Sequence, residues 1–577
     1  MKKSISWLLA IVSTASLACA TACKGNENYN ADNFLTAEQA EAEYGNAYRI
    51  VKDTVTLDIF VPRGSMNPAY ETMKMFKKLE EVTNLDFNFI EADTSSYTNQ
   101  RTAAWGDDLP DFFLFGNTVS EQVIYSKEGM LVPFNDSSLE VEGVAVGSLI
   151  DNYMPTYKKL LDENFNIETS INAKETATLS DGKMYSTVSA MDVPRDLTYK
   201  MWINQKWIEN INNNASLKIK LNANFGVDTL PTVDEIDTID DLLLVLRAFK
   251  KLDANMNGNA NDEIPVTALE MAYLRNFIMA SYGVVSNSVE ISNDGTKFDY
   301  TPATDAYRQY LKTAHMMYEE GLIDNSTFSM KTDAEMAAKG YEGNLGMFCA
   351  AAAYLTVGYN LEADYTALAP ITSTYYTGAP LQYGFSPFGA DVAVIPSGTP
   401  YVREIARLLD IMYSDLGVQL LAYGEENVDW IWDDEAKTSW TFKVPDNWTG
   451  TQEEYRATIT PNVGTGAAIY WSYDFVGKMN DPIITKLNKE SEKYLPFIKV
   501  PIPEDVILAA EDYSPASLIL TDLGPYVEMT EYNFVTGEKN WDIEVDANWN
   551  TYLTELKGYK YEQVVTMYNN ALNAKKA

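Results

Sequence analysis

The chain has 577 residues and a formal net charge of −38 at pH 7, from 82 acidic and 44 basic side chains. This surplus of negative charge argues against nucleic acid and against anionic membrane surfaces as partners. A chain of this length exceeds what one hydrophobic core supports, so we expect at least two lobes.

The first 22 residues have the features of a signal that is removed from the mature protein. Lysines at positions 2 and 3 precede an apolar run at 5–18 that is too short to span a membrane. Small residues then precede Cys23, a pattern that resembles a lipoprotein signal in which this cysteine is lipidated. Cys19 is the competing site, and an ordinary secretory signal is the alternative. We therefore expect an extracytoplasmic protein, lipid-anchored to the bacterial cell membrane through a tether at 23–47.

The segments that follow alternate between strand-like and helix-like patterns. Alternating apolar residues predict strands at 55–61 and 85–90, helical periodicity predicts helices at 68–81 and 96–105, and an apolar run predicts a short strand at 112–115. Strands and helices that alternate at this spacing imply a parallel sheet covered by helices. Ligands of such sheets bind beyond the carboxyl ends of the strands.

Three further helices are predicted at 238–251, 306–320 and 402–413 from their apolar periodicity. The first begins at a capping-box analogue, in which Thr238 is followed three residues later by Asp241. This helix leads directly into a loop that is rich in side-chain oxygen atoms.

The loop at 253–263 predicts a calcium site. Oxygen-bearing side chains recur there at Asp253, Asn255, Asn257, Asn259 and Asn261, and Asp262 and Glu263 follow at once. Calcium takes roughly six to eight oxygen ligands, which an alternating loop can supply. Gly258 stands at the sixth position, where an EF-hand-type loop makes its sharp turn. An Asn-rich turn without metal is the alternative.

Sequence patterns typical of catalysis are missing from the chain. There is one histidine, His315, in a predicted helix, and there is no GxSxG, HExxH, P-loop or GxGxxG motif. A glycosidase-type carboxylate pair could be present among 82 acids, but no acid stands in a context that singles it out. Cys349 lies in an apolar run without a partner for a disulfide and is expected in the core. We therefore predict a binding protein and not an enzyme.

The aromatic content suggests what is bound. The chain has 37 tyrosines and 11 tryptophans. Many must belong to the core, but a surplus of amphipathic rings in an acidic, exported protein also fits a sugar-binding cleft. There flat rings stack on sugar faces while polar groups bind hydroxyls.

Several separated segments, in the expected order, resemble one family. They are Leu-Pro-Asp at 109–111, Glu-Gly-Met-Leu-Val-Pro at 128–133, Asp-Gly-Lys-Met-Tyr at 181–185, Met-Trp-Ile-Asn-Gln-Lys-Trp-Ile at 201–208, the helix and loop at 230–265, Tyr-Glu-Glu-Gly-Leu-Ile at 318–323, and the segments at 409–414 and 549–556. Together they resemble the extracellular solute-binding lipoproteins of ABC transporters, family 1, of the carbohydrate-binding, LplA-like or alginate-binding-protein-like type.

The resemblance implies an α/β, two-lobed, periplasmic-binding-protein-like fold of type II. Each lobe would be a mainly parallel sheet flanked by helices, with a hinged cleft between the lobes. Lobe 1 would comprise 48–192 and 370–426, and lobe 2 would comprise 193–369 and 427–577, with the oxygen-rich loop in lobe 2. The chain would cross between them near 192–199, 369–374 and 424–429.

The resemblance also implies a function. The protein would be a monomeric substrate-binding lipoprotein that captures a carbohydrate, an oligosaccharide, and delivers it to the permease subunits of an ABC importer. A secreted glycan-degrading enzyme and a peptide- or other nutrient-binding surface lipoprotein are the alternatives. A structural Ca²⁺ would be held by Asp253, Asn255, Asn257, Asn259, Asp262 and Glu263. One extra residue precedes the acidic pair relative to the family, so Asn261, Asp262 and Glu263 compete as the ligand that closes the shell.

Aromatic and arginine side chains near the expected crossings and strand ends are the candidates for ligand binding. They are Arg195, Tyr199, Trp202, Tyr383, Trp430, Trp471 and Trp105. The arginine would donate paired hydrogen bonds, and the rings would stack on sugar faces. Against each ring stands the alternative of an ordinary core aromatic residue.

Overall fold

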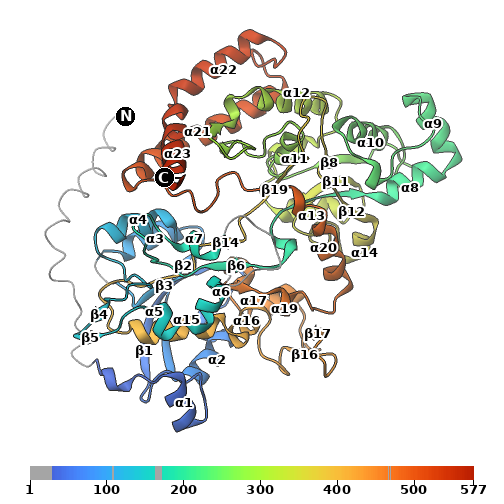
Figure 1. Cartoon of the computed structure of the whole chain (residues 1–577). Helices are drawn as coiled ribbons and strands as arrows, with labels where there is room; N and C mark the ends of the chain where they lie inside the picture. The colour runs from blue at the N-terminus through green and yellow to red at the C-terminus, as the bar shows by residue number, and fades with distance from the viewer. Residues whose placement is uncertain (1–28, 107–108, 163–171, 466, 468, 577) are drawn as a thin grey trace, which may run out of the picture. The chain divides into compact units, whose positions relative to one another are not determined.

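The computed structural model of the protein describes residues 29–106, 109–162, 172–465, 467 and 469–576 (Figure 1). The predicted signal and both candidate lipidation sites, Cys19 and Cys23, lie outside these residues. Contacts divide the chain into unit 1, Met1–Asp192 with Phe388–Asn480, and unit 2, Val193–Pro387 with Asp481–Ala577. None of the helices in the described ranges has both the length and the apolar character that a bilayer crossing requires.

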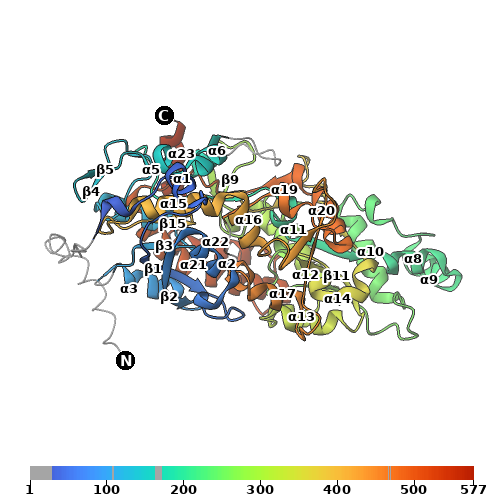
Figure 2. The same cartoon turned by 90° about the horizontal axis from the view of Figure 1, so that it is seen from below.

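Unit 1 is built on a four-stranded sheet with the order β15-β3-β1-β2. β1 (Val55–Arg63) pairs in parallel with β2 (Leu85–Asp93) and with β3 (Phe112–Leu114), and β15 (Ala393–Val394) adds an antiparallel edge. Figures 1 and 2 both show the first three strands beside one another. The predicted strands at 55–61, 85–90 and 112–115 are therefore confirmed.

Helices connect and cover the strands of unit 1. They include α2 (Lys74–Thr83), α3 (Tyr97–Ala104), α4 (Val119–Lys127) and α15 (Val402–Tyr413). The helix predicted at 68–81 begins only at Lys74, because a 3₁₀ turn at Tyr70–Thr72 precedes it. α2 buries Phe76 and Leu79, which its periodicity predicted, and also Met75, in the core of unit 1.

A second sheet of unit 1 includes a strand from the segment at 427–480. β6 (Ser189–Met191) pairs with β14 (Phe388–Gly389) and, in parallel, with β18 (Tyr470–Trp471). The sequence placed 427–480 in lobe 2, and the contacts place it in unit 1. The physical reason is a fully buried carboxylate: Asp429 forms an ion pair with Lys74 of α2 and accepts a hydrogen bond from Tyr455 Oη at 3.0 Å.

Unit 2 is built on a four-stranded sheet with the order β12-β7-β11-β8. β7 (Lys200–Asn204) runs antiparallel to β11 (Leu345–Ala350) and to β12 (Tyr365–Leu368), whereas β8 (Ile264–Thr267) is parallel to β11. Every residue of β7 is buried, so both faces of this strand are covered.

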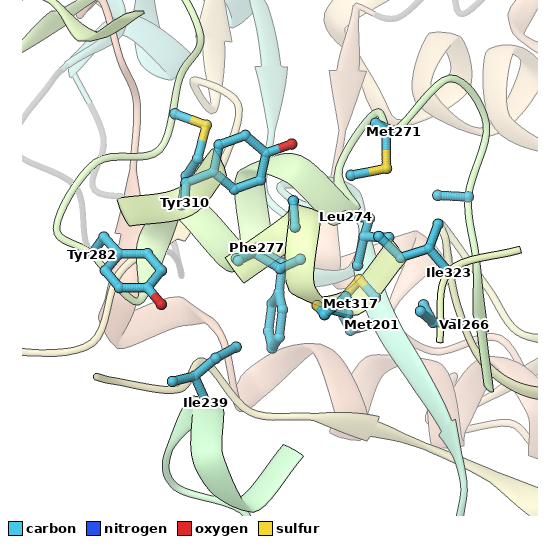
Figure 3. Packing of buried hydrophobic residues seen from close by; sticks show 14 of the residues in the cluster. Met201, Ile239, Val266, Met271, Leu274, Phe277, Tyr282, Tyr310, Met317 and Ile323 are labelled. Atoms are coloured by element: carbon cyan, nitrogen blue, oxygen red, sulfur yellow. The ribbon is translucent and has the colours of Figure 1, made fainter. Parts of the chain in front are cut away.

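The helices of unit 2 include α10 (Ile239–Lys251), α11 (Leu274–Ala280), α12 (Asp305–Glu319) and α21 (Ala510–Thr536). Figure 3 shows Phe277 of α11 and Met317 of α12 in the core of the unit, together with Met201 of β7. The helices predicted at 238–251 and 306–320 are confirmed, and Thr238 forms the predicted capping box with Asp241.

The segment at 370–387 belongs to unit 2, whereas the sequence placed it in lobe 1. Its backbone is tied to the start of α10, since Ile239 N donates to Thr372 O at 2.9 Å and Thr372 N donates to Asp237 O at 3.0 Å. The ring of Tyr376 lies against Gly283, where an added Cβ would come within 2.6 Å of the ring. The chain therefore returns to unit 1 at Phe388.

The N-terminal segment is folded from Tyr29 onward, whereas the sequence predicted a tether over 23–47. A guanidinium of α15, that of Arg403, donates to the Tyr29 hydroxyl at 2.9 Å. One turn later, Arg407 donates to Leu35 O at 2.8 Å. These contacts hold the segment from Tyr29 onward on unit 1.

Glu404 lies between these two arginines and is 1 % exposed, and its Oε2 atom has no hydrogen-bond partner. Burial raises its pKa from 4.5 to about 7. Between these values the folded protein binds more protons than the unfolded chain. The stability that the neutral carboxyl confers is therefore present below pH 4.5 and is lost as the pH rises through 7.

We expect Glu404→Gln to remove this pH dependence. Raising the pH from 4.5 to 8 should lower the unfolding free energy of the wild type by about 3 kcal/mol more than that of the variant. Urea unfolding at both pH values measures the shift. Glu38→Gln, at an exposed position in α1 (Ala37–Tyr44), is the control and should show no such change. Equal shifts for both variants would contradict the prediction.

Candidate ligand-binding site

Four connections of unit 2 meet at one edge of its sheet. The register pairs Lys200, the first residue of β7, with Ala350, the last residue of β11. It also pairs Met201 with Leu368, the last residue of β12, and Phe348 of β11 with Thr267, the last residue of β8. The segments that follow β8, β11 and β12, and the segment that precedes β7, therefore lie at this edge. We call it the ligand edge, because α/β proteins hold ligands beyond the carboxyl ends of their strands.

Four half-buried rings gather from these connections: Tyr199, Tyr273, Tyr383 and Phe385, the unit-2 aromatic cluster. The rings of Tyr199 and Tyr273 stack with centroids 4.0 Å apart and an interplanar angle of 13°. Tyr383 lies 6.2 Å from Tyr273 and 5.6 Å from Phe385. A partly exposed wall of rings is suited to stacking against the apolar faces of sugars.

Hydrogen bonds tie the two halves of this cluster together. Thr198 Oγ1 donates to Tyr383 O at 2.6 Å, and Phe385 N donates to Leu197 O at 2.8 Å. Hydrogen bonds thus join the segment before β7 to the segment before Phe388 at this edge of unit 2. The sequence proposed Tyr199 and Tyr383, and it missed Tyr273 and Phe385.

Tyr273 stands in a strained turn. Glu270, Met271 and Tyr273 have φ values of 45°, 63° and 58°, a left-handed conformation that costs non-glycine residues roughly 1–3 kcal/mol each. Such strain persists only where surrounding contacts impose it, and it concentrates at ligand sites. No glycine or asparagine marks the turn, so the sequence contains no signal for it.

Arg195 stands in a 3₁₀ turn (Pro194–Asp196) just before β7 and is mostly buried. Its guanidinium lies 3.4 Å from the carboxylate of Asp196. The fully buried amine of Lys200 donates to the main-chain carbonyl of Arg195, and burial lowers the pKa of Lys200 to about 8. The turn that carries the arginine is thus held firmly at the ligand edge.

Two of the proposed tryptophans lie in the cores of their units. Trp202 of β7 is buried, and its Nε1 donates to Ala350 O at 3.1 Å. Trp430 of β16 (Trp430–Trp432) is buried as well, and its Nε1 donates to Gly424 O at 2.9 Å. Both rings are enclosed and both indole donors are satisfied, which is the alternative that their sequence context allowed.

The other two tryptophans, both in unit 1, are also largely buried. Trp105 is stacked between Phe113 and Tyr125, each with its centroid 4.4 Å away. Trp471 lies 5.9 Å from the guanidinium of Arg456. The Nε1 atoms of Trp105 and Trp471 are buried and have no hydrogen-bond partner.

Polar side chains that the sequence missed gather at the carboxyl edge of the unit-1 sheet. Arg101 of α3 is buried, donates to Gly116 O at 2.8 Å and lies 3.0 Å from the Glu121 carboxylate. Gln122 Nε2 donates to Ala390 O at 2.6 Å, while its Oε1 has no partner. Asp391 Oδ1 has none either, and burial raises the pKa of this carboxyl. These two acceptors can receive hydrogen bonds from hydroxyl groups or from water.

The oxygen-rich loop connects α10 to β8 in unit 2. Its asparagines form successive turns, since the Oδ1 atoms of Asn255, Asn257 and Asn259 accept hydrogen bonds from the backbone N–H two residues onward. The side-chain amides of Asn255 and Asn257 donate to Asp262, which draws that carboxylate across the loop. Gly258 has a φ of 91°, the turn that its position predicted.

Two carboxylate oxygens in this loop are buried without a hydrogen-bond partner: Asp253 Oδ1 and Glu263 Oε2. Their second oxygens accept from Gly258 N at 3.1 Å and from Ala254 N at 2.9 Å. Burial raises the pKa of Glu263, as expected for a carboxylate that lacks a counter-ion. These residues fit a hard cation, and they favour Glu263 as the closing ligand.

Amide and backbone oxygens would have to complete such a site. Within the described part of the chain, no three histidine, cysteine, aspartate or glutamate side chains are grouped so that they could hold a metal ion. A calcium shell built here would therefore combine the two end carboxylates with neutral oxygens, which calcium accepts.

Comparison with known proteins agrees with this architecture. No protein-family model matches the chain. The fructooligosaccharide ABC transporter substrate-binding protein FusA of Streptococcus pneumoniae is 25% identical over 568 residues, which cover 95% of this chain and 94% of the relative.

Solved structures share the fold. FusA of S. pneumoniae in complex with kestose has a TM-score of 0.67 and 23% identity, over 90% of this chain and 99% of that one. An HMO-binding, ABC-transporter-associated solute-binding protein of Bifidobacterium longum infantis has a TM-score of 0.71 and 17% identity, over 91% of this chain and 99% of that one. Alginate-binding protein AlgQ2 without calcium ion has a TM-score of 0.64 and 20% identity, over 92% and 100%.

The fold is thus that of the two-lobed α/β solute-binding proteins. The resemblance to solute-binding proteins of ABC transporters, which the sequence segments indicated, is confirmed.

Proposed function

We propose that this protein is the substrate-binding component of an ABC importer and that it captures an oligosaccharide. The observation that carries the proposal is the unit-2 aromatic cluster, four half-buried rings at the carboxyl edge of the sheet. Rings of this kind stack on sugar faces, and Arg195 in the adjoining turn can donate to hydroxyls. The 25% identity with FusA, whose name assigns fructooligosaccharide to it, supports the same ligand class.

The proposal extends to the setting of the protein. The predicted signal is removed, Cys23 carries the lipid, and the folded chain works as a monomer outside the cytoplasm. Its partners are the permease subunits of the importer, to which it delivers the glycan. It binds and does not cleave its ligand.

Calcium in this proposal is structural. Asp253 and Glu263 hold it at the two ends of the loop, with oxygens of Asn255, Asn257, Asn259 and Asp262 between them. The ion would stabilise the connection between the end of α10 and the start of β8. An EF-hand mutant of FusA and a calcium-free AlgQ2 are among the proteins of this fold, which supports a calcium loop in the same architecture.

Removing rings of the unit-2 aromatic cluster tests the ligand site. Tyr199→Ala and Tyr273→Ala are each expected to weaken oligosaccharide binding about 10- to 100-fold, equal to about 1.4–2.8 kcal/mol, because each deletes a stacking surface. Titration calorimetry with kestose, fructo-nystose, milk oligosaccharides and alginate oligosaccharides measures the loss. Tyr532→Ala, at an exposed position in α21, is the control.

Trp202→Phe tests a ring of the core instead of a ring of the candidate site. Because Trp202 is enclosed in the core, this change should lower thermal stability and leave affinity nearly unchanged. A wild-type protein that binds none of these glycans would contradict the proposal. Shortened sugars in chromatograms after long incubation would favour the glycan-degrading alternative.

A further inference from the structure

A hollow lies between two C-terminal helices of unit 2 and shares no residue with the unit-2 aromatic cluster. It has a volume of about 350 Å³ and is lined by Tyr526 of α21 and by Glu555, Gly558 and Tyr559 at the end of α22 (Asp546–Gly558). In Figure 1, α22 lies well apart from β11 and β12, whose ends form the ligand edge. The volume is at the lower end of the range for small-molecule sites. We call it the C-terminal hollow.

Two tyrosine rings line the C-terminal hollow. The rings of Tyr526 and Tyr559 have centroids 4.6 Å apart and an interplanar angle of 32°. Tyr526 also stacks on the ring of Tyr552, at 6.1 Å and 11°, and Tyr552 is only 1% exposed. The lining is therefore anchored in the core of unit 2. Tyr559 follows the last residue of α22 and is 37% exposed, so its ring is accessible to a ligand.

A carboxylate supplies the polar part of the lining. The hydroxyl of Tyr526 donates to Glu555 Oε2 at 2.6 Å. Burial and this hydrogen bond to the acid raise the pKa of Tyr526, so its hydroxyl keeps the proton that it donates. Glu555 is exposed and has no ion-pair partner among the residues that the structure describes. A carboxylate has about four acceptor positions, so most of them remain for a ligand.

This lining suits a neutral sugar better than an ion. A flat ring beside a hydrogen-bond acceptor matches the apolar C–H face and the hydroxyl groups of a sugar unit. The rings of Tyr526 and Tyr559 lie against one another and do not surround a space, as the rings of an ammonium-binding cage do. An anionic sugar would bring a second negative charge next to Glu555, which Coulomb repulsion opposes.

We propose that the C-terminal hollow is a second sugar-binding site of this protein. It takes one neutral sugar unit, which stacks on the exposed ring of Tyr559 and donates hydroxyl hydrogen bonds to Glu555. The site does not depend on the proposed function, because it has no residue in common with the candidate ligand site. A sugar unit held in the hollow would leave the ligand edge free.

Binding of single sugars to the whole protein tests this site. The probes are the methyl glycosides of glucose, galactose, mannose and fructose, with methyl glucuronoside as the anionic comparison, and saturation-transfer NMR measures their binding. At least one neutral glycoside is expected to bind both the wild type and Tyr199→Ala, a variant of the candidate ligand site, whereas methyl glucuronoside should bind neither.

Two variants of the hollow should remove this binding. Glu555→Gln is expected to weaken it about 10-fold, because a neutral amide replaces a charged acceptor of the same size. Gly558→Leu should abolish it. A Cβ at Gly558 would meet no atom within 4 Å, so the added side chain fits at the wall of the hollow and competes with the sugar for the space. Thermal unfolding checks that both variants are folded, and Glu555→Gln decides the outcome where Gly558→Leu loses stability.

Matched controls separate the hollow from the rest of the surface. Tyr559→Phe keeps the ring and should keep the binding, and Tyr532→Ala, exposed on α21, should not change it. The inference is overturned by binding that persists in Glu555→Gln and Gly558→Leu, by its loss in Tyr199→Ala, by choline binding in place of the neutral glycosides, or by no binding at all. None of these results bears on the proposed function, which calorimetry with kestose and longer glycans tests separately.

Discussion

Replacing Glu531 by alanine is expected to destabilise unit 2 by about 3–5 kcal/mol. The Glu531 carboxylate in α21 accepts hydrogen bonds from Arg275 of α11 at 2.7 and 2.5 Å and another from the Tyr310 hydroxyl of α12. The side chain of Glu531 is only 2% exposed, and that of Arg275 is 9% exposed. Removing the acid leaves a guanidinium buried without its counter-ion, and this desolvated charge is the source of the loss.

Two comparisons test that origin. Asp299→Ala breaks the ion pair between Asp299, which is 44% exposed, and Lys297, which is 60% exposed. This change should cost about 0–1 kcal/mol of stability. Arg275→Met combined with Glu531→Leu removes both charges and should recover most of the loss. Denaturant unfolding gives the free energies. A Glu531→Ala variant as stable as Asp299→Ala would show that the pair contributes little.

Adding calcium to metal-free protein is expected to raise its unfolding temperature. A ligand at 100 times its dissociation constant stabilises the folded state by about 2.7 kcal/mol. Asp253 Oδ1 and Glu263 Oε2 are buried without partners, so a cation between them would compensate two desolvated negative charges. Asp253→Asn and Glu263→Gln should each abolish most of the calcium-dependent shift, measured by thermal unfolding with calcium and with chelator.

The control for charge is Asp294→Asn, which removes one acid from another turn of unit 2 and should leave the calcium response intact. In chelator, Glu263→Gln should be as stable as the wild type or slightly more so, because it removes a carboxyl whose pKa burial raises. Equal unfolding temperatures of the wild type with calcium and with chelator would disprove the metal site.

The candidate site could be predicted from the sequence only in part. Tyr199 was proposed from its place at the first expected crossing and Tyr383 from its Gly-rich connection, and both lie in the unit-2 aromatic cluster. Trp202 was proposed from the first crossing as well and lies in the core. β7 is buried on both faces, so the alternation that separates inner from outer residues gives no signal there.

Tyr273 could not have been found by pattern. Its turn has three left-handed residues without glycine or asparagine, and contacts from elsewhere impose that conformation. The same holds for the polar group at the carboxyl edge of unit 1, where Arg101, Gln122 and Asp391 come from three distant segments.

By itself the sequence determined the local structure and the class of protein. Apolar periodicity located β1, β2 and α10, because the buried face of a strand or helix repeats within a short stretch of sequence. The order of short segments indicated the solute-binding fold. Only the tertiary structure decided that 370–387 belongs to unit 2, that 427–480 belongs to unit 1, and which rings come together in the unit-2 aromatic cluster. Those outcomes depend on strand pairing and on buried partners such as Lys74 and Asp429, which lie far apart along the chain and meet only after folding.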